Sequence, residues 1–291
     1  MKKIAVVNDL SGFGKCSLVA DISVLTAMGH SVYPVTTAVL TAQTGFARWH
    51  CEPMTQMLPR YTQEWRALSA RFDAILVGFL MSEAQADEVL SFIKAFRPKN
   101  GPVLLDPISA DSGRIFDHIT PGLIEKLRTL AEKADILTPN VSELCLLADA
   151  GMKAVLSLSG DTLTEKLTEL SRTLLNRPGK CVIVTGVPGT EPDPDSAEGA
   201  AERKTIGNLV VTEKGAELIR FPSIGTSYSG TGDLFAAAVL GGALNGRDFA
   251  QSTHTAGEFI LRAVRDAHAA GTDPREGAAF EAHLPMLRER V

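Results

Sequence analysis

The most informative stretch of the chain is GTSYSGTGDLFAAAVL, residues 225–240. At its centre lies GTGD, which ends at Asp233 and precedes a run of small and apolar residues. Alanine is a strong helix former, so we expect a helix to begin near Asp233. Glycines let the backbone approach a phosphate closely, and the amides of a first helical turn attract anions. The stretch therefore predicts an anion site at the start of a helix.

Asp233 would lie beside this predicted anion site. A carboxylate is a poor ligand for an anion, but it suits a base that removes a proton from an attacking hydroxyl group. The alternative interpretation is a glycine turn in which Asp233 only caps the helix. These residues fit both interpretations equally well, so the rest of the chain has to distinguish them.

Composition argues against several classes of function. The chain has 291 residues, is 45% hydrophobic and carries a net charge of -5, with no long basic run that would indicate a nucleic-acid partner. Its first residues, MKKIAVVNDLSG, predict a buried strand and not a signal peptide, and no apolar stretch approaches the roughly 20 residues that cross a bilayer. The four cysteines include no CxxC pair, so we expect reduced thiols in a cytoplasmic protein and no zinc site. Because no stretch is long and apolar enough to cross a bilayer, we also expect no membrane partner.

The N-terminal region predicts the start of a parallel sheet. A strand over residues 3–8 is followed by the loop LSGFGK, a helix over 17–28 and a second strand over 31–37. The loop matches neither a P-loop nor the dinucleotide pattern GxGxxG. Because ligands of open α/β sheets bind at the carboxyl ends of strands, Asp9 and Ser11 are candidate substrate contacts. Alternatively, these two residues only form the turn.

The remaining pattern predicts one α/β domain over residues 1–291, with a central, mostly parallel sheet flanked by helices. Residues 36–50 show no clear period and predict a flap or a surface connection. Residues 206–221 alternate as a β-hairpin does, and we expect a small β flap from this hairpin and the segment near residue 40. Residues 189–203 are charged and contain two prolines, which predicts a solvated loop.

Polar residues recur at the ends of further predicted strands. These strands cover residues 73–79, 102–106, 135–137 and 180–185, the last ending at Thr185-Gly186. Asp106 closes one strand, and Thr138 and Asn140 lead from another into a helix that carries Glu143. Since the carboxyl ends of parallel strands share one edge, we expect Asp106 and Glu143 to face one cleft, where two carboxylates beside phosphates suggest Mg²⁺. For each residue alone, a helix cap or turn former is the alternative.

Four motifs in this order resemble the ribokinase-like superfamily, and most closely its pyridoxal kinase branch. GTGDLFAA at residues 230–237 is similar to the carboxyl-terminal signature of that branch. LDPISADSG at 105–113 resembles its DPVxGDxG segment, and TPNVSE at 138–143 matches its TPNxxE. YPVTTAVLTAQT at 33–44, with Trp49, resembles the segment that carries a pyridoxal-contacting threonine. The resemblance covers nearly the whole chain and implies the three-layer sandwich of the superfamily.

The resemblance also implies an activity: an ATP-dependent kinase for the 5′-hydroxymethyl group of pyridoxal, pyridoxine or pyridoxamine, in the salvage of pyridoxal phosphate. Asp233 matches the catalytic base of the family, and the amides of Gly230, Thr231 and Gly232 match its anion hole. ATP and Mg²⁺ are the implied cofactors, with a monovalent cation such as K⁺. We also expect a homodimer.

The other candidate site residues fall into three groups. Nucleotide contacts are expected from Asp111, Asn140, Glu143, Thr185, Gly186 and Thr226. Metal contacts are expected from Asp106, Thr138 and Glu143. Substrate contacts are expected from Asp9, Ser11, Thr44 and Phe79.

Two departures from the pyridoxal kinase pattern leave the substrate open. The first loop, NDLSGFGK at residues 8–15, is short, has Asp9 where the family has a serine, and looks more like the hydroxymethylpyrimidine kinases of the same superfamily. Phe79 replaces a family tyrosine. The alternatives are therefore a hydroxymethylpyrimidine kinase or, in a different class, a non-catalytic nucleotide- or vitamer-binding protein. The last is opposed by the occupation of every expected catalytic position. An anionic Asp9 would tilt the choice among vitamers toward pyridoxamine.

Overall fold

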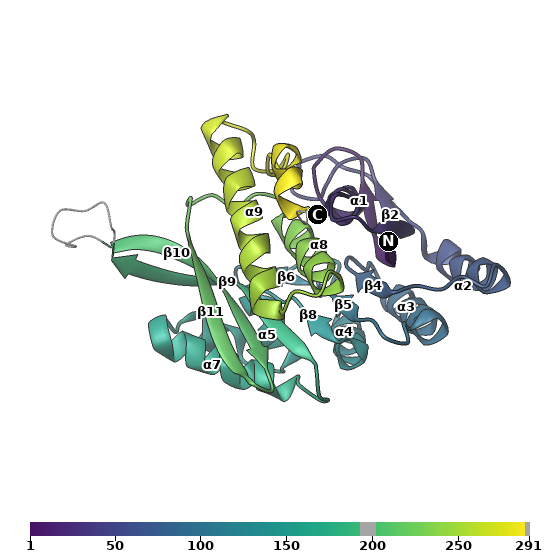
Figure 1. Cartoon of the computed structure of the whole chain (residues 1–291), viewed down its shortest axis with the longest axis horizontal. Coiled ribbons are helices and arrows are strands. Elements are labelled where there is room, and N and C mark those ends of the chain that lie inside the picture. The colour runs from purple at the N-terminus through teal and green to yellow at the C-terminus, as the bar shows by residue number, and fades with distance from the viewer. Residues whose placement is uncertain (193–201, 289–291) are drawn as a thin grey trace.

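A nine-stranded sheet forms the centre of the computed structural model, which describes residues 1–192 and 202–288 (Figure 1). Its order is β11-β10-β9-β8-β5-β4-β1-β2-β3. In chain order, its strands are β1 (Lys3–Ser11), β2 (Ser31–Leu40), β3 (Cys51–Pro53), β4 (Ala74–Val77), β5 (Val103–Leu105), β8 (Ile136–Leu137), β9 (Cys181–Pro192), β10 (Glu202–Thr212) and β11 (Gly215–Pro222). The six central strands, from β9 to β2, pair in parallel, and the outer pairings are antiparallel. The prediction of a mostly parallel sheet is confirmed.

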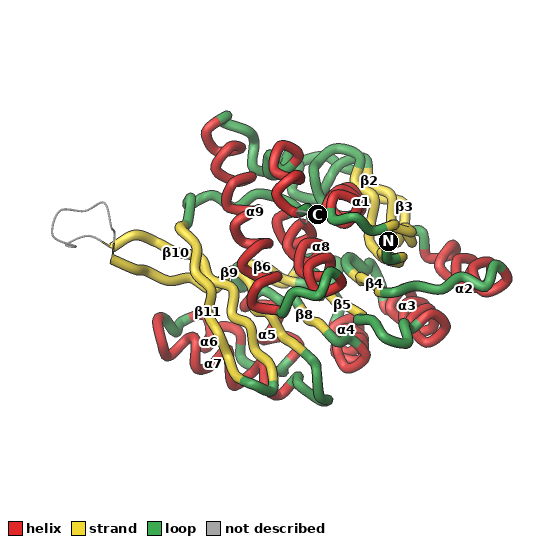
Figure 2. Tube along the Cα trace, viewed as in Figure 1, coloured by secondary structure: helices red, strands yellow, loops and turns green. Residues whose placement is uncertain are grey.

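Helices cover both faces of the sheet, which gives three layers (Figure 2). One face packs against α1 (Ser17–Ala27), α8 (Thr231–Leu244), α9 (Phe249–Ala269) and the 3₁₀ segment η3 (Glu281–Leu287). The other face packs against α2 (Leu58–Ala67), α3 (Glu83–Phe96), α4 (Pro121–Lys133), α5 (Val141–Leu147), α6 (Met152–Leu156) and α7 (Gly160–Thr173). Successive strand residues alternate between these two cores, as the pleat requires: Val6 lies in the first and Val7 in the second.

Local sequence explains where several helices begin. The Ser82 hydroxyl accepts from the Gln85 amide at the start of α3, and Thr120 accepts from Leu123 before α4. Asp248 and Gln251 form a capping box at the start of α9. The helix predicted over residues 17–28 agrees closely with α1. No helix in the described ranges combines the length and the hydropathy that crossing a membrane requires.

Helix α8 is buried along most of its length because its residues are small and apolar on every side. It lies next to α9 (Figure 1) and also packs on α1. A Cβ atom on Gly241 would lie 2.4 Å from Met28 Sδ, and one on Gly242 would lie 2.6 Å from Ser252 Oγ. The two glycines therefore let α1 and α9 approach the carboxyl end of α8 closely.

Strand β9 differs from its prediction. It does not end at Thr185-Gly186 but continues to Pro192, so the solvated loop predicted over 189–203 is partly strand; residues 193–201 lie outside the described part of the chain. The pairing with β10 shifts register at this point, where Gly186 has φ 71°. This shift is a β-bulge or a similar irregularity, and it lets the strand continue past the turn-forming pair Thr185-Gly186.

The residues expected to form a β flap lie at the two edges of the main sheet. Strand β2 runs on to Leu40 and pairs with β3, and the predicted hairpin is formed by β10 and β11. A separate two-stranded sheet is instead made by β6 (Ala110–Asp111) and β7 (Arg114–Ile115). The four cysteines are all free thiols, as expected.

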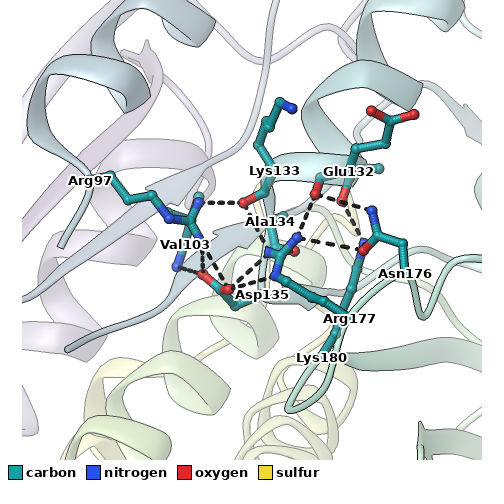
Figure 3. Close-up of polar contacts among 10 residues, drawn as sticks. Arg97, Val103, Glu132, Lys133, Ala134, Asp135, Asn176, Arg177 and Lys180 are labelled. Carbon is teal, nitrogen blue, oxygen red and sulfur yellow. Dashed lines mark hydrogen bonds and ion pairs between the residues drawn. The ribbon is translucent and has the colours of Figure 1, made fainter. Parts of the chain in front are cut away.

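A polar cluster closes the carboxyl end of α4 at the amino edge of the sheet (Figure 3). Arg177 donates to the carbonyls of Glu132 and Lys133 at 2.6 and 3.1 Å and pairs with the Asp135 carboxylate at 2.8 Å. Lys180 donates to the carbonyl of Ala131 at 2.7 Å. The last carbonyls of a helix have no partner within the helix, and cations near them are favourable.

We expect Arg177→Ala to lower the free energy of unfolding by about 2–3 kcal/mol, because it removes the principal donor to the carbonyls of Glu132 and Ala134 and one of the two arginines that pair with Asp135. Urea denaturation of the variant measures this loss. Turnover per folded molecule should stay unchanged, since the cluster lies at the sheet edge opposite to the strand carboxyl ends. Unchanged stability would contradict the capping role.

Candidate active site

The carboxyl ends of β1, β5, β8 and β9 bring the candidate residues to one edge of the sheet. Asn140, just after β8, forms a parallel bridge with Thr185 of β9. Asp106 follows β5 and accepts a hydrogen bond from Thr138 at 3.1 Å. A Cβ on Gly232 would lie 3.7 Å from Asp106 Oδ2, which places the GTGD turn against the end of β5. Segments that are far apart in the chain therefore meet at this edge.

The two glycines of the turn have different roles in the fold. Gly230 caps α8 with φ 81°, and a Cβ there would lie 2.2 Å from the carbonyl oxygen of Lys15. The fold therefore requires glycine at this position. Gly232 is exposed, and its Cβ would meet only Asp106 at an ordinary contact distance. A side chain at Gly232 would instead occupy the space in front of the first-turn amides of α8, where an anion would bind.

Asp233 does not cap α8, so that interpretation is wrong: the cap residue is Gly230. Its buried carboxylate accepts hydrogen bonds from the amide of Ser17 at 2.8 Å and from the side chain of Asn8 at 3.2 Å. Ser17 adopts φ 53°, a left-handed conformation that costs a non-glycine residue about 1–2 kcal/mol. Such strain tends to persist at functional sites, and here it accompanies the bond to Asp233.

The environment of Asp233 raises its affinity for a proton. Burial raises the pKa of Asp233 to about 6, the charge of Asp9 adds to this effect, and the bonds from Ser17 and Asn8 oppose it. A carboxylate with a raised pKa is still ionised at neutral pH and accepts a proton more readily than an exposed one. The geometry and the charge of Asp233 thus suit a general base.

Asp106 has one carboxylate oxygen free to bind a cation. Thr138 donates to Oδ1, while Oδ2 receives no hydrogen bond from the described residues. Burial and the charge of Asp233 raise the pKa of Asp106. A cation at Oδ2 would offset both effects, so this carboxylate fits a metal ion.

Glu143 and Asn140 form a capping box at the start of α5. The Glu143 carboxylate accepts from the amides of Asn140 at 2.8 Å and of Ser109 at 3.1 Å, and the Asn140 side chain donates to the carbonyl of Ala110 at 2.7 Å. The helix-cap interpretation of these two residues therefore describes real bonds. A carboxylate offers about four lone-pair sites, so Glu143 keeps capacity for a ligand beside its backbone donors. Asp111 follows Ala110 and is exposed.

No all-protein metal cage exists in the described ranges, since no three His, Cys, Asp or Glu residues are grouped to hold an ion. Mg²⁺ does not require such a cage, because it commonly binds one or two carboxylates together with substrate phosphates and water. Asp106, with Glu143 nearby, meets this lesser requirement.

The substrate candidates are held to differing degrees. Ser11 donates to the Asp9 carboxylate at 2.9 Å, both are buried, and burial raises the pKa of Asp9. The backbone amide of Phe79 donates to Asn8 at 2.9 Å. Thr44 is exposed. The backbone amide of the preceding residue, Gln43, donates to the carbonyl of Phe13 in the first loop. In the described part of the chain, neither Thr44 nor Thr226 has a side-chain hydrogen bond to the cluster around Asp233.

Two buried residues of this edge were not among the sequence candidates. Asn8 bonds to Asp233, and Asp21 of α1 bonds to Asn8 at 2.8 Å. Asp21 is fully buried. It lies on the same helical face as Leu18 and Leu25, so a carboxylate within the apolar stripe was the signal in the sequence that could have identified it.

Comparisons with known proteins agree on the family and the fold. The family model described as phosphomethylpyrimidine kinase matches residues 14–276. Pyridoxal kinase PdxY of Corynebacterium diphtheriae is 27% identical over 286 residues, which cover 96% of this chain and 93% of the relative.

Two solved structures illustrate the similarity in three dimensions. A phosphomethylpyrimidine kinase homologue from Bacteroides thetaiotaomicron, crystallised with pyridoxal, is 33% identical with a TM-score of 0.85, over 98% of this chain and 95% of that chain. Pyridoxal kinase from Lactobacillus plantarum, 24% identical, has a TM-score of 0.84 over 99% and 96% of the two chains and shows the same fold.

Proposed function

The chain belongs to the phosphomethylpyrimidine kinase family, and we propose that it transfers the γ-phosphate of ATP to the 5′-hydroxymethyl group of a vitamin B6 vitamer. It is a phosphotransferase with the ribokinase-like fold. The observation that carries the proposal is the buried Asp233 carboxylate at the start of α8, beside the first-turn amides. The vitamer is favoured by the pyridoxal kinase relatives and by the structure that contains pyridoxal.

In the proposed reaction, Asp233 accepts the proton of the hydroxymethyl group as the hydroxymethyl oxygen attacks the γ-phosphorus in line. The bond from the γ-phosphorus to the bridging oxygen of ATP breaks, and ADP leaves. The amides of Gly230, Thr231 and Gly232 stabilise the charge on the transferring group, since donors fixed in advance act at no reorganisation cost. Asp9, Ser11, Thr44 and Phe79 are the proposed substrate contacts. Catalysis then consists of positioning and electrostatics, with little covalent chemistry.

We also propose which residues contact the nucleotide and the metal ion. Asp111, Asn140, Thr185, Gly186 and Thr226 are the proposed nucleotide contacts. Asp106, Thr138 and Glu143 would hold Mg²⁺, which neutralises charge on the phosphates when bound. A monovalent cation such as K⁺ is proposed near Asp106, Thr138 and Thr185. We also propose that the protein is a cytoplasmic homodimer of single-domain chains. Light scattering would measure the mass of the dimer.

A hydroxymethylpyrimidine kinase is the second candidate function. The first loop favours it, because Asp9 stands where pyridoxal kinases carry a serine. Release of ADP from MgATP, measured in parallel with pyridoxal, pyridoxine, pyridoxamine and hydroxymethylpyrimidine, separates the two candidates. Turnover on a vitamer supports the proposal, turnover on the pyrimidine alone replaces it, and ligand binding without ADP release would indicate a non-catalytic binding protein.

The rate should depend on the protonation of Asp233. Because burial raises the pKa of Asp233 to about 6, the base is ionised at neutral pH and becomes protonated as the pH falls through this value. We expect kcat/KM for the acceptor substrate, which reports the pKa of the free enzyme, to be level above that pH and to fall about tenfold for each further unit of acidity, as a single essential base requires. Initial rates at acceptor concentrations well below KM, in buffers of constant ionic strength, measure this acid limb. A rate that stays level well below this pH would contradict the assignment of the base.

A further inference from the structure

Asn8 is a fully buried amide whose orientation is fixed by its partners. Its Oδ1 accepts hydrogen bonds from the backbone amides of Asp9 at 3.0 Å and Phe79 at 2.9 Å. Because backbone N–H groups can only donate, the atom that they reach must be the carbonyl oxygen of the side chain. The NH₂ group therefore points the other way, toward α1 and α8.

The NH₂ group joins two carboxyl groups. Nδ2 donates to Asp21 Oδ2 at 2.8 Å and to Asp233 Oδ1 at 3.2 Å, so both of its hydrogens are used. A Cβ on Gly78 would lie 2.7 Å from three atoms of the amide, which shows how closely the end of β4 confines it. The amide thus links β1, α1 and α8 through bonds that leave it no freedom to turn.

Asp21 is the residue whose position the proposed reaction does not explain. It is fully buried, Asn8 is the donor to its Oδ2, and its Oδ1 has no hydrogen-bond partner. The charged groups that act on it are the carboxylates of Asp233, Asp106 and Asp9. A buried carboxylate with one neutral donor and negative neighbours is costly to ionise. Burial first, and then the charge of Asp233, raise the pKa of Asp21 well above its ordinary value.

We propose that Asp21 is a positioning residue of the phosphate transfer: its Oδ2 holds the Asn8 amide, and this amide holds Oδ1 of Asp233 in the orientation of the base. The inference rests on the proposed function, because it assigns Asp21 a role in that reaction. Ser17 holds the other oxygen of Asp233, so the carboxylate is fixed at both ends. The bond from Asn8 also stabilises the ionised form of Asp233 and limits the rise of its pKa.

Two substitutions of Asp21 separate positioning from simple packing. Asp21→Leu has a similar shape but no acceptor, so the NH₂ group of Asn8 loses its partner on α1, while Oδ1 keeps its two backbone bonds. We expect kcat to fall about tenfold or more, and the acid limb of the kcat/KM profile to move to higher pH by about one unit, while KM for ATP changes by less than about threefold. Asp21→Asn keeps a carbonyl oxygen as acceptor and should restore kcat to within about threefold of the wild type, with the limb at its wild-type position.

The control is Arg177→Ala, which lowers stability at the other edge of the sheet and should leave the acid limb in place. If Asp21→Leu does not fold, Asp21→Ser serves instead, because its shorter side chain cannot reach Asn8 and is more readily tolerated. A wild-type limb and a wild-type kcat per folded molecule in the variant without an acceptor would overturn the proposal. Equal impairment of Asp21→Asn, with its fold intact, would overturn it as well.

A measurement without substrate distinguishes failure of this inference from failure of the proposed function. The pKa of Asp233 can be followed by NMR through its side-chain carboxyl carbon in the free protein. A higher pKa of Asp233 in Asp21→Leu than in Asp21→Asn supports the positioning role even if none of the four acceptors is phosphorylated. Equal values in the two variants would overturn it, whichever substrate the enzyme uses.

Discussion

Replacing Asp233 by asparagine is expected to lower kcat by about a hundredfold or more, the range that loss of a general base produces. The amide cannot accept the proton of the attacking hydroxyl group, although it keeps the shape of the side chain and an oxygen for the bond from Asn8 or Ser17. ATP binding should change little, because the first-turn amides of α8 remain. Steady-state release of ADP, with ATP affinity measured separately, tests this. Retained turnover would contradict the role of Asp233 as the base.

The same variant should be more stable than the wild type. Because the folded-state pKa of Asp233, about 6, lies above its ordinary value of 3.8, the ionised side chain costs stability at neutral pH. That cost disappears as the pH falls from about 6 toward 3.8, because the side chain becomes protonated, and asparagine removes the cost at every pH. The gain is at most about 3 kcal/mol, from 1.36 kcal/mol per pKa unit, less the hydrogen bond that the amide loses.

A matched control for this variant is Asp161→Asn. Asp161 also lies in the first turn of a helix, α7, but it is exposed and has no hydrogen bond to the described residues around Asp233. Its kcat should equal that of the wild type. A comparable loss in both variants would indicate a general effect of acidic first-turn residues on the fold and would remove the special status of Asp233.

Replacing Gly230 by alanine is the second substitution with a large expected effect. The residue has φ 81°, which costs an alanine about 1–2 kcal/mol. In addition, the new Cβ would lie 2.2 Å from Lys15 O and 2.9 Å from Cys16 Cα, and backbone atoms cannot rotate away. The first loop or the start of α8 must therefore move. We expect a loss of unfolding free energy of about 2 kcal/mol or more and a fall in kcat of more than about tenfold, because misplacement of a catalytic group by an ångström is costly.

Gly179→Ala isolates the conformational part of this effect. Gly179 has φ 76°, but nothing lies within 4 Å of a Cβ built on it. The substitution should cost only the left-handed conformation, about 1–2 kcal/mol, and leave kcat unchanged. Urea denaturation and initial rates of both variants measure the difference. Equal effects would show that the contact between the GTGD turn and the first loop does not matter.

Local patterns predicted the regular elements well and failed where tertiary pairing competed with them. The apolar period and the cap at Ser82 define α3, and both are read from neighbouring residues. Strand β9 is the opposite case. Its Thr185-Gly186 pair and later prolines indicate a turn and a loop, but pairing with β10 extends the strand past them. Backbone hydrogen bonds to a neighbouring strand outweighed a local preference that is weak in energy.

Residue types and their order along the chain were sufficient to predict the alternation of strands and helices and the family, and they led to the proposal that Asp233 of GTGD is the base. They also predicted that polar residues at strand ends would share one edge, since parallel strands end together. They did not predict the bonds among Asn8, Asp21 and Asp233, which lie on three elements far apart in the sequence. The burial of these side chains and the distances between them depend on neighbours that come from all parts of the fold. For this reason the raised pKa of Asp233, and the buried Asp21 that we propose positions it, were decided only by the tertiary structure.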